Sequence, residues 1–180
     1  MAQFFIVAVL LLALPSICLG QKVVTTDPAN AKINSCLAKN ASQSSTLASN
    51  LNKPISGGQF TFYGNPSGAG ACGQDTGKPA GFSAAASGKL FVDSQKWVAP
   101  CSGTQWVLSD QVCINKCVKI TYKCVKCTAS KTLTVPINNK CPECAVNHVD
   151  LSTDAFNYLE PQGGTVGIAK NAVITYITCP

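Results

Sequence analysis

The sequence predicts an all-β fold, a disulfide-rich β-barrel with one or two short helices. Three observations support this prediction: many short β-favouring runs, a single convincing helix, and an even number of cysteines behind an apolar leader. The length of 180 residues suits one domain after the leader, large enough to bury a core.

The first twenty residues determine the predicted compartment. Met1–Gly20 is apolar, has no charged side chain and ends in small residues, which is typical of a secretory signal peptide. We therefore expect a secreted, extracellular protein, and no later apolar run is long enough to predict a membrane span. Cys18 would leave with the leader, and an even count in an exported chain predicts up to five disulfides of undetermined pairing. The remaining cysteines are Cys36, Cys72, Cys101, Cys113, Cys117, Cys124, Cys127, Cys141, Cys144 and Cys179.

Residues 21–58 are predicted to be an extension that precedes the barrel domain of residues 59–180. A short, possibly helical piece runs from Asp27 to Cys36, and Ser, Ala and Asn then dominate up to Pro54. Apart from the anchor that Cys36 provides, we expect this segment to be mobile. Asn40 begins an Asn-Ala-Ser sequon and is a candidate glycosylation site.

From residue 59 onward the pattern is that of strands. In the clearest run, Val118, Ile120 and Tyr122 alternate with polar side chains, the period of a half-buried strand. Pro136 predicts an edge, an end or a bulge in the run that contains it. The expected strands are 59–63, 90–92, 106–108, 117–123, 132–137 and 171–178.

One helix is expected, from Thr153 to Leu159. Ser152 is predicted to cap it, Asp154 stands in its first turn, and Pro161 with the following glycines ends it. The segment between His148 and this helix is expected to have irregular backbone.

The charge is basic and unusual, because all 14 basic residues are lysines against 8 acids. Residues 111–142 hold several lysines and no acid. Such a face suits an acidic glycan or an anionic cell wall, while a merely solvated hairpin is the alternative. The absence of Arg argues against a nucleic-acid partner.

Two Cys-x-x-Cys pairs, Cys124 with Cys127 and Cys141 with Cys144, have spacing close to that of a zinc ribbon. In an exported chain with further cysteines, disulfides are the favoured interpretation. Neither pair stands at a strand-to-helix junction, where a redox motif would be expected. We expect no metal and no cofactor.

Three blocks in order resemble the expansin-like family, which includes barwin-like and plant natriuretic-peptide-like proteins and relatives of the family-45 glycoside hydrolases. The blocks begin at Thr61-Phe-Tyr63-Gly64, at Cys117-Val-Lys-Ile-Thr121 and at Cys141-Pro-Glu-Cys144, the last running through His148-Val-Asp150-Leu-Ser152. The resemblance covers residues 59 to 179 and implies a six-stranded double-psi β-barrel.

The same resemblance implies a functional aspartate at Asp150, with a turn acid near the helix as the structural alternative. In the hydrolase relatives a second carboxyl group belongs near the first strand, but here no acid precedes Asp75 within the resembling region. Since glycoside hydrolysis normally needs two carboxyl groups, hydrolysis is disfavoured. The expected substrate-binding residues, each with ordinary packing as the alternative, are Thr61, Tyr63, Gly64, Asn139, His148, Trp97 and Trp106.

These observations predict a protein that binds, and in some settings loosens, an extracellular polysaccharide of a cell wall without hydrolysis. A lytic transglycosylase or weak glycosidase with Asp150 as acid and base is one alternative. A barwin-like defence or interaction protein that acts through the lysine-rich hairpin is another. The expected partner is the polysaccharide or cell wall, with no nucleic acid, and the protein is expected to be a monomer.

Overall fold

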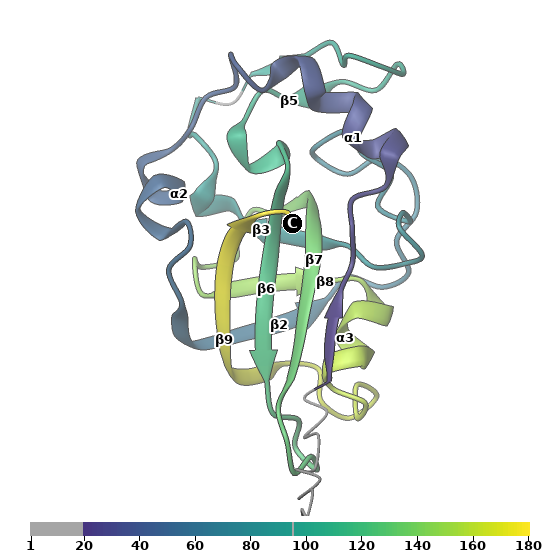
Figure 1. Cartoon of the computed structure of the whole chain (residues 1–180), viewed down its shortest axis with the longest axis vertical. Helices are drawn as coiled ribbons and strands as arrows, with labels where there is room; N and C mark the ends of the chain where they lie inside the picture. The colour runs from purple at the N-terminus through teal and green to yellow at the C-terminus, as the bar shows by residue number, and fades with distance from the viewer. Residues whose placement is uncertain (1–19, 95) are drawn as a thin grey trace, which may run out of the picture.

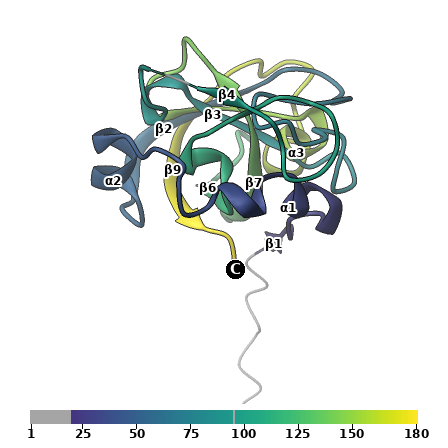
Figure 2. The ribbon, with the colours of Figure 1, turned by 90° about the horizontal axis from the view of Figure 1, so that it is seen from above.

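The computed structural model describes residues 20–94 and 96–180, so the predicted signal peptide, apart from Gly20, lies outside the described residues. The chain forms a mixed β-barrel of six strands with a seventh strand added to it, a separate two-stranded hairpin, and short helices outside the barrel (Figures 1 and 2). The barrel strands are β2 (Ile55–Phe62), β3 (Ala84–Ser87), β6 (Lys116–Tyr122), β7 (Lys131–Cys141), β8 (His148–Leu151) and β9 (Ala169–Thr178).

The strand order is β7-β3-β8-β2-β9-β6, and β6 pairs with β7 to close the barrel. The pairs β2–β8 and β3–β7 are parallel, whereas β2–β9, β3–β8, β6–β7 and β6–β9 are antiparallel. β1 (Gln21–Val23) runs parallel to the first half of β7. This confirms the predicted six-stranded barrel as a mixed one.

Pro136 lies inside β7, at the place where the partner of that strand changes. β1 pairs with β7 as far as Thr134, and β3 begins to pair at Ile137. Because proline has no N–H to donate, the gap between these partners is a position where it removes no ladder hydrogen bond on that side.

The remaining elements are short. The helices are α1 (Pro28–Asn34), α2 (Ser45–Asn50) and α3 (Thr153–Leu159), with 3-10 turns η1 (Ser35–Leu37), η2 (Gly88–Leu90) and η3 (Gln111–Cys113). β4 (Trp97–Val98) and β5 (Val107–Leu108) form the separate hairpin. The strand predicted at residues 90–92 is wrong, since Leu90 ends η2 and Phe91 follows it in extended backbone.

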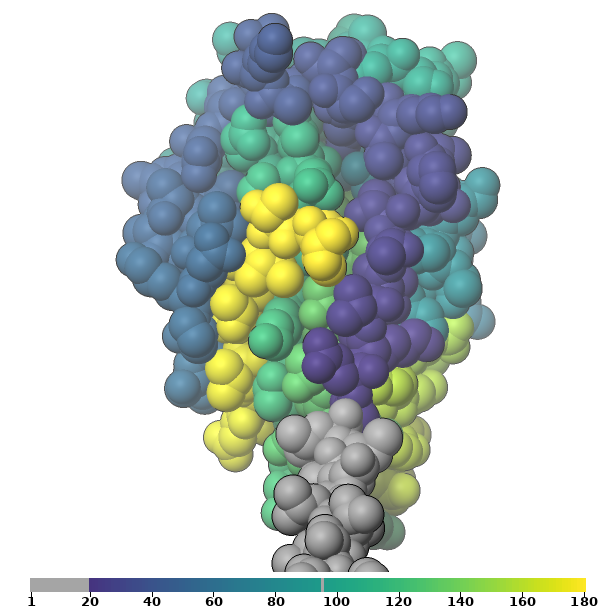
Figure 3. Space-filling model, viewed as in Figure 1, coloured from purple at the N-terminus to yellow at the C-terminus, as the bar shows by residue number. Residues whose placement is uncertain are grey.

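The extension of residues 21–58 packs onto the barrel. Figure 3 shows it along the face that contains β9, β6 and β7, and Val24 and Leu47 are buried in the core. β2 crosses the predicted boundary at residue 58. The capping residue Asp27 accepts hydrogen bonds from the backbone N–H groups of Ala29 and Asn30, which explains why α1 begins at Pro28.

α3 has the predicted bounds, but the predicted cap is wrong in its bonding. Ser152 stands at the N-cap position without a side-chain capping bond. Its hydroxyl instead accepts a hydrogen bond from the Ser83 backbone N–H at 3.1 Å, and this ties the helix start to the chain that leads into β3.

The core is apolar and built around aromatic rings. Phe60 makes edge-on contacts with Tyr122 and Phe156, with ring centroids 5.0 and 5.1 Å apart. Branched side chains from the strands fill the remaining space, among them Val118, Ile120, Leu133, Val149, Leu151 and Ile174.

The ten cysteines form five disulfides: Cys36–Cys101, Cys72–Cys113, Cys117–Cys179, Cys124–Cys127 and Cys141–Cys144. Both Cys-x-x-Cys pairs are therefore disulfides and not zinc ligands. Three bridges span 41 to 65 residues: Cys36–Cys101 joins η1 to the β4–β5 loop, Cys72–Cys113 joins the loop after β2 to η3, and Cys117–Cys179 joins β6 to the C-terminal end of the chain. Such a set of bridges favours an oxidising compartment.

Candidate functional site

Parallel pairing of β2 and β8 assembles a polar cluster on the outer face of the barrel. Side chains alternate along both strands, so Phe60 and Val149 are buried while their neighbours face outward. The register places Gln59 opposite His148 and Thr61 opposite Asp150. Two segments almost ninety residues apart in the sequence thus bring four polar side chains together.

A chain of hydrogen bonds joins the four side chains of this cluster. The Thr61 hydroxyl donates to Asp150 Oδ1 at 2.8 Å, so its oxygen accepts from His148 Nε2–H at 2.9 Å. His148 Nδ1 then accepts from the Gln59 amide at 3.2 Å. The backbone here is a regular strand, so the irregularity expected between His148 and the helix is wrong.

Asp150 is only partly exposed. Burial raises the pKa of its carboxyl group, and the Thr61 hydrogen bond and nearby His148 oppose that rise while Glu143 adds to it. Tyr63 continues along the same face of β2, and its hydroxyl is hydrogen-bonded to Ser83. Burial raises the pKa of Tyr63 to about 12 despite that hydrogen bond, so its hydroxyl is neutral at physiological pH.

Beside the cluster lies an open groove of about 430 Å³. Tyr63, Asn65 and Pro66 line one part of it, and Trp97 and Asn139 contribute to the rest. A side chain at Gly70 would come within 2.5 Å of the Asn138 carbonyl, which explains the glycine in this lining.

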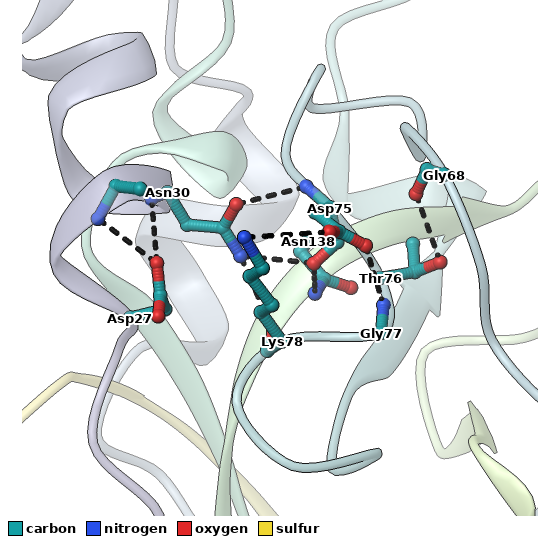
Figure 4. A network of polar contacts seen from close by, with 9 residues as sticks. Asp27, Asn30, Gly68, Asp75, Thr76, Gly77, Lys78 and Asn138 are labelled. Atoms are coloured by element: carbon teal, nitrogen blue, oxygen red, sulfur yellow. Dashed lines mark hydrogen bonds and ion pairs between the residues drawn. The ribbon is translucent and has the colours of Figure 1, made fainter.

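A polar network holds the loop that borders the groove (Figure 4). The buried Asn30 amide of α1 donates to the Asp75 carbonyl at 2.9 Å and accepts from the Asp75 backbone N–H at 2.8 Å. On the same loop, Thr76 donates to the Gly68 carbonyl. The predicted extension therefore positions part of the site.

The other predicted site residues have varied places. Asn139 Oδ1 accepts from the Ala71 and Lys140 backbone N–H groups, so it holds the backbone of the groove. Gly64 has a φ of +90° and its carbonyl accepts from Thr153 at the start of α3. Trp106 is exposed and does not belong to the groove lining, and Asn40 is exposed, so its glycosylation stays a prediction.

Among the described residues, Cys141, Glu143 and Cys144 bring potential metal-binding atoms within 4.8 Å of one another. Both sulfur atoms form a disulfide, which leaves Glu143 as the only ordinary ligand of the three. Nothing in this group fits a metal ion. No helix within residues 20–94 and 96–180 is long and apolar enough to cross a membrane.

Sequence reasoning missed four polar residues that the structure places in key positions. Gln59 and Ser83 complete the hydrogen bonds of His148 and Tyr63. Asp110 and Glu160 are buried acids that hold backbone N–H groups. The alternation in 59–63 would have placed Gln59 beside Thr61, whereas nothing local distinguishes Glu160 from an exposed acid.

Comparison with known proteins leads to a papain inhibitor. No family model matches the chain. The papain inhibitor of Streptomyces mobaraensis is 29% identical over 104 residues, which are 58% of this chain and 60% of that protein. This chain thus aligns with less than two thirds of the curated relative. The solved structure of a Streptomyces papain inhibitor superposes with a TM-score of 0.50 at 22% identity, covering 71% of this chain and 96% of that one, and supports the common fold.

These findings correct the sequence-based identification. The expansin-like resemblance is wrong, because both the sequence and the structural comparison lead to a papain inhibitor. The polysaccharide-binding function and the polysaccharide or cell-wall partner, which depended on that resemblance, are wrong with it.

Proposed function

We propose that this protein is a secreted inhibitor of papain-like cysteine proteases. The observation that carries the proposal is that a papain inhibitor is found both by sequence and by structure. Secretion is supported by the apolar leader and the five disulfides.

The physical character of the fold supports this proposal. A protein that occupies a protease cleft must resist local opening, since cleavage of a transiently open segment would destroy it. In the chain-entropy account, each of the three long bridges, spanning 65, 41 and 62 residues, contributes about 4 kcal/mol by restricting the unfolded chain.

The test is a direct inhibition assay. The oxidised protein with five intact disulfides is titrated into papain with a fluorogenic peptide substrate, and a serine protease such as trypsin serves as the specificity control. We expect stoichiometric loss of papain activity while the inhibitor remains a single intact chain. Reduced and alkylated protein should lose the effect. Full papain activity at a hundredfold excess of oxidised protein would contradict the proposal.

We further propose that the barrel has double-psi topology and that residues 21–58 and 59–180 are an extension and a domain. The parallel pairs β2–β8 and β3–β7 support the first point. The role of Asp150 as a catalytic residue stays a prediction. The binding roles of the other predicted site residues likewise stay predictions.

A further inference from the structure

The hairpin of β4 and β5 presents the two tryptophans of the chain at the ends of one loop. Trp97 lies opposite Leu108 and Val98 opposite Val107. The side chains of Trp97 and Trp106 are 52% and 62% exposed. Single exposed apolar residues are ordinary, but indole rings are costly to leave in water and are, with Tyr and Arg, enriched among the anchors of protein interfaces.

The loop between these tryptophans is braced from several sides. Cys101, near its middle, is bonded to Cys36 of η1, and its backbone N–H donates to the Ile33 carbonyl at 2.9 Å. At the base of the hairpin, the backbone N–H of Ser109 donates to the Lys96 carbonyl at 2.9 Å. A loop held in this way loses little conformational entropy when it binds.

The tip of the loop is free to make new contacts. Residues 102–105 are exposed, and their backbone N–H groups donate to no other residue of the described chain. Gly103 has a φ of +86° and open space around it, so the turn is one that only glycine adopts without strain. Its peptide groups are available to a partner's backbone, as an unpaired strand edge is.

The composition of the loop distinguishes it from another exposed loop that a disulfide holds. Residues 97–106 contain no charged side chain. The tip of the β6–β7 hairpin, closed by Cys124–Cys127, exposes Val125 between Lys123 and Lys126. The centres of interfaces are depleted in charge and enriched in aromatic residues, which favours the tryptophan loop.

The groove lies directly against this loop. Trp97 is part of its lining, and β5 is tied to it as well, because the Leu108 backbone N–H donates to the carbonyl of Ala71, another lining residue. A protruding uncharged loop with a hollow beside it offers one contact surface for entering a cleft and another for receiving the rim of that cleft.

We propose that residues 97–106, here called the tryptophan loop, form the surface that enters the active-site cleft of a papain-like cysteine protease, with Trp97 and Trp106 as its anchors. This inference rests on the proposed inhibitory function and adds the surface that carries it out. The occupant of the surface is a protease cleft, because the comparisons lead to a papain inhibitor and the loop is braced, uncharged and rich in unpaired peptide groups.

The experiment measures the inhibition constant for papain with wild type, Trp97→Ala, Trp106→Ala and the double variant. Val125→Ala is the matched control, an exposed apolar side chain on the tip that Cys124–Cys127 closes. We expect each tryptophan substitution to weaken inhibition about 30-fold or more, the size typical of an interface anchor. Val125→Ala should stay within about twofold of wild type. Trp106→Phe keeps an aromatic face, so this variant should retain most of the inhibition that Trp106→Ala loses.

The outcomes separate this inference from the function beneath it. Wild type that does not inhibit papain overturns the proposed function and the inference with it. Inhibition by wild type that survives the double tryptophan substitution overturns the inference alone, as does a loss confined to Val125→Ala. Because both indoles are largely exposed, the variants should fold, and an unchanged thermal unfolding midpoint together with the mass of the fully oxidised chain verifies this.

Discussion

The carboxylate of Glu160 accepts a hydrogen bond from the Tyr122 hydroxyl at 2.9 Å in a place without solvent exposure. The same carboxylate accepts from the backbone N–H groups of Val125 at 3.0 Å and Gln162 at 2.9 Å. Glu160 thereby fastens the tip of the β6–β7 hairpin to the end of α3. Burial alone would raise the pKa of this carboxyl, but the three hydrogen bonds and the charge of Lys131 lower it below its ordinary value.

Glu160→Gln should destabilise the protein by about 1–3 kcal/mol, because an amide nitrogen cannot accept the bonds that a carboxylate oxygen accepts. Chemical denaturation of the oxidised protein at pH 7 measures this loss, and Glu143→Gln, at an exposed acid, is the control. A lowered folded-state pKa stabilises the fold above the ordinary value near 4.5, and this contribution disappears as the pH falls through the folded-state pKa. The free energy of unfolding of the variant should therefore fall less steeply at acid pH than that of wild type. Equal slopes for the two proteins would contradict the stabilising role of the Glu160 carboxylate.

The tyrosines predict a delayed alkaline titration. All four have a raised pKa through burial: Tyr63 and Tyr122 to about 12, and Tyr158 and Tyr176 above the ordinary value of 10. Because the neutral phenols are favoured by the fold, stability is fully present below pH 10 and is lost as the pH rises toward 12. Phenolate absorbance should rise late in the native protein and near pH 10 in guanidinium chloride. Coincident titrations in the two states would disagree with the burial of these rings.

The extent to which the sequence determines the structure differs between local and distant features. The bounds of α3 were predicted correctly and those of the β6 strand to within one residue, because helix-start residues and strict alternation are local signals. The parallel partners of β2 and β7 were not predicted, since they depend on connections across the whole domain. Residues 21–58 were expected to be mobile because their contacts with the barrel also depend on distant parts of the chain. That expectation was wrong, since Leu47 is buried in the core and only 1% exposed.

The candidate site shows the same division. Thr61, Tyr63, His148 and Asp150 were named from sequence blocks, and the structure brings Thr61, His148 and Asp150 into one hydrogen-bonded cluster. The function attached to them was wrong, because a polar cluster on a barrel does not specify a ligand. Trp97 and Trp106 were named as substrate-binding residues, yet nothing local revealed that Cys101 braces the loop between them.

Asp150→Asn should increase stability at pH 7 by about 1 kcal/mol or less, because it removes a partly buried charge and keeps an oxygen that accepts the Thr61 hydrogen bond. Since the folded-state pKa is raised above the ordinary 3.8, the cost of the carboxylate accumulates as the pH rises from that ordinary value through the folded-state pKa. The gain should therefore shrink toward zero as the pH falls below 3.8, where the wild-type group becomes protonated in both states. Denaturation curves at pH 3.5 and pH 7 measure the difference. The same variant should inhibit papain as wild type does, and a large loss of inhibition would place this cluster in the protease contact.

The double variant Cys36→Ser and Cys101→Ser should be cleaved by papain as a substrate and inhibit it less. Loss of a bridge that spans 65 residues costs about 4 kcal/mol in the chain-entropy account, while Cys124→Ser with Cys127→Ser, which opens a loop of three residues, should cost much less. Without its brace the tryptophan loop must be ordered at each binding event, so inhibition should weaken and papain should begin to cut the chain between residues 99 and 106. Mass spectrometry of timed digests locates the cut, with the Cys124/Cys127 variant as the matched control. The reason is that a rigid loop resists cleavage and a flexible loop does not. If cleavage begins elsewhere, or if inhibition remains at the wild-type level, the bridge to Cys36 is not what makes this loop an inhibitory surface.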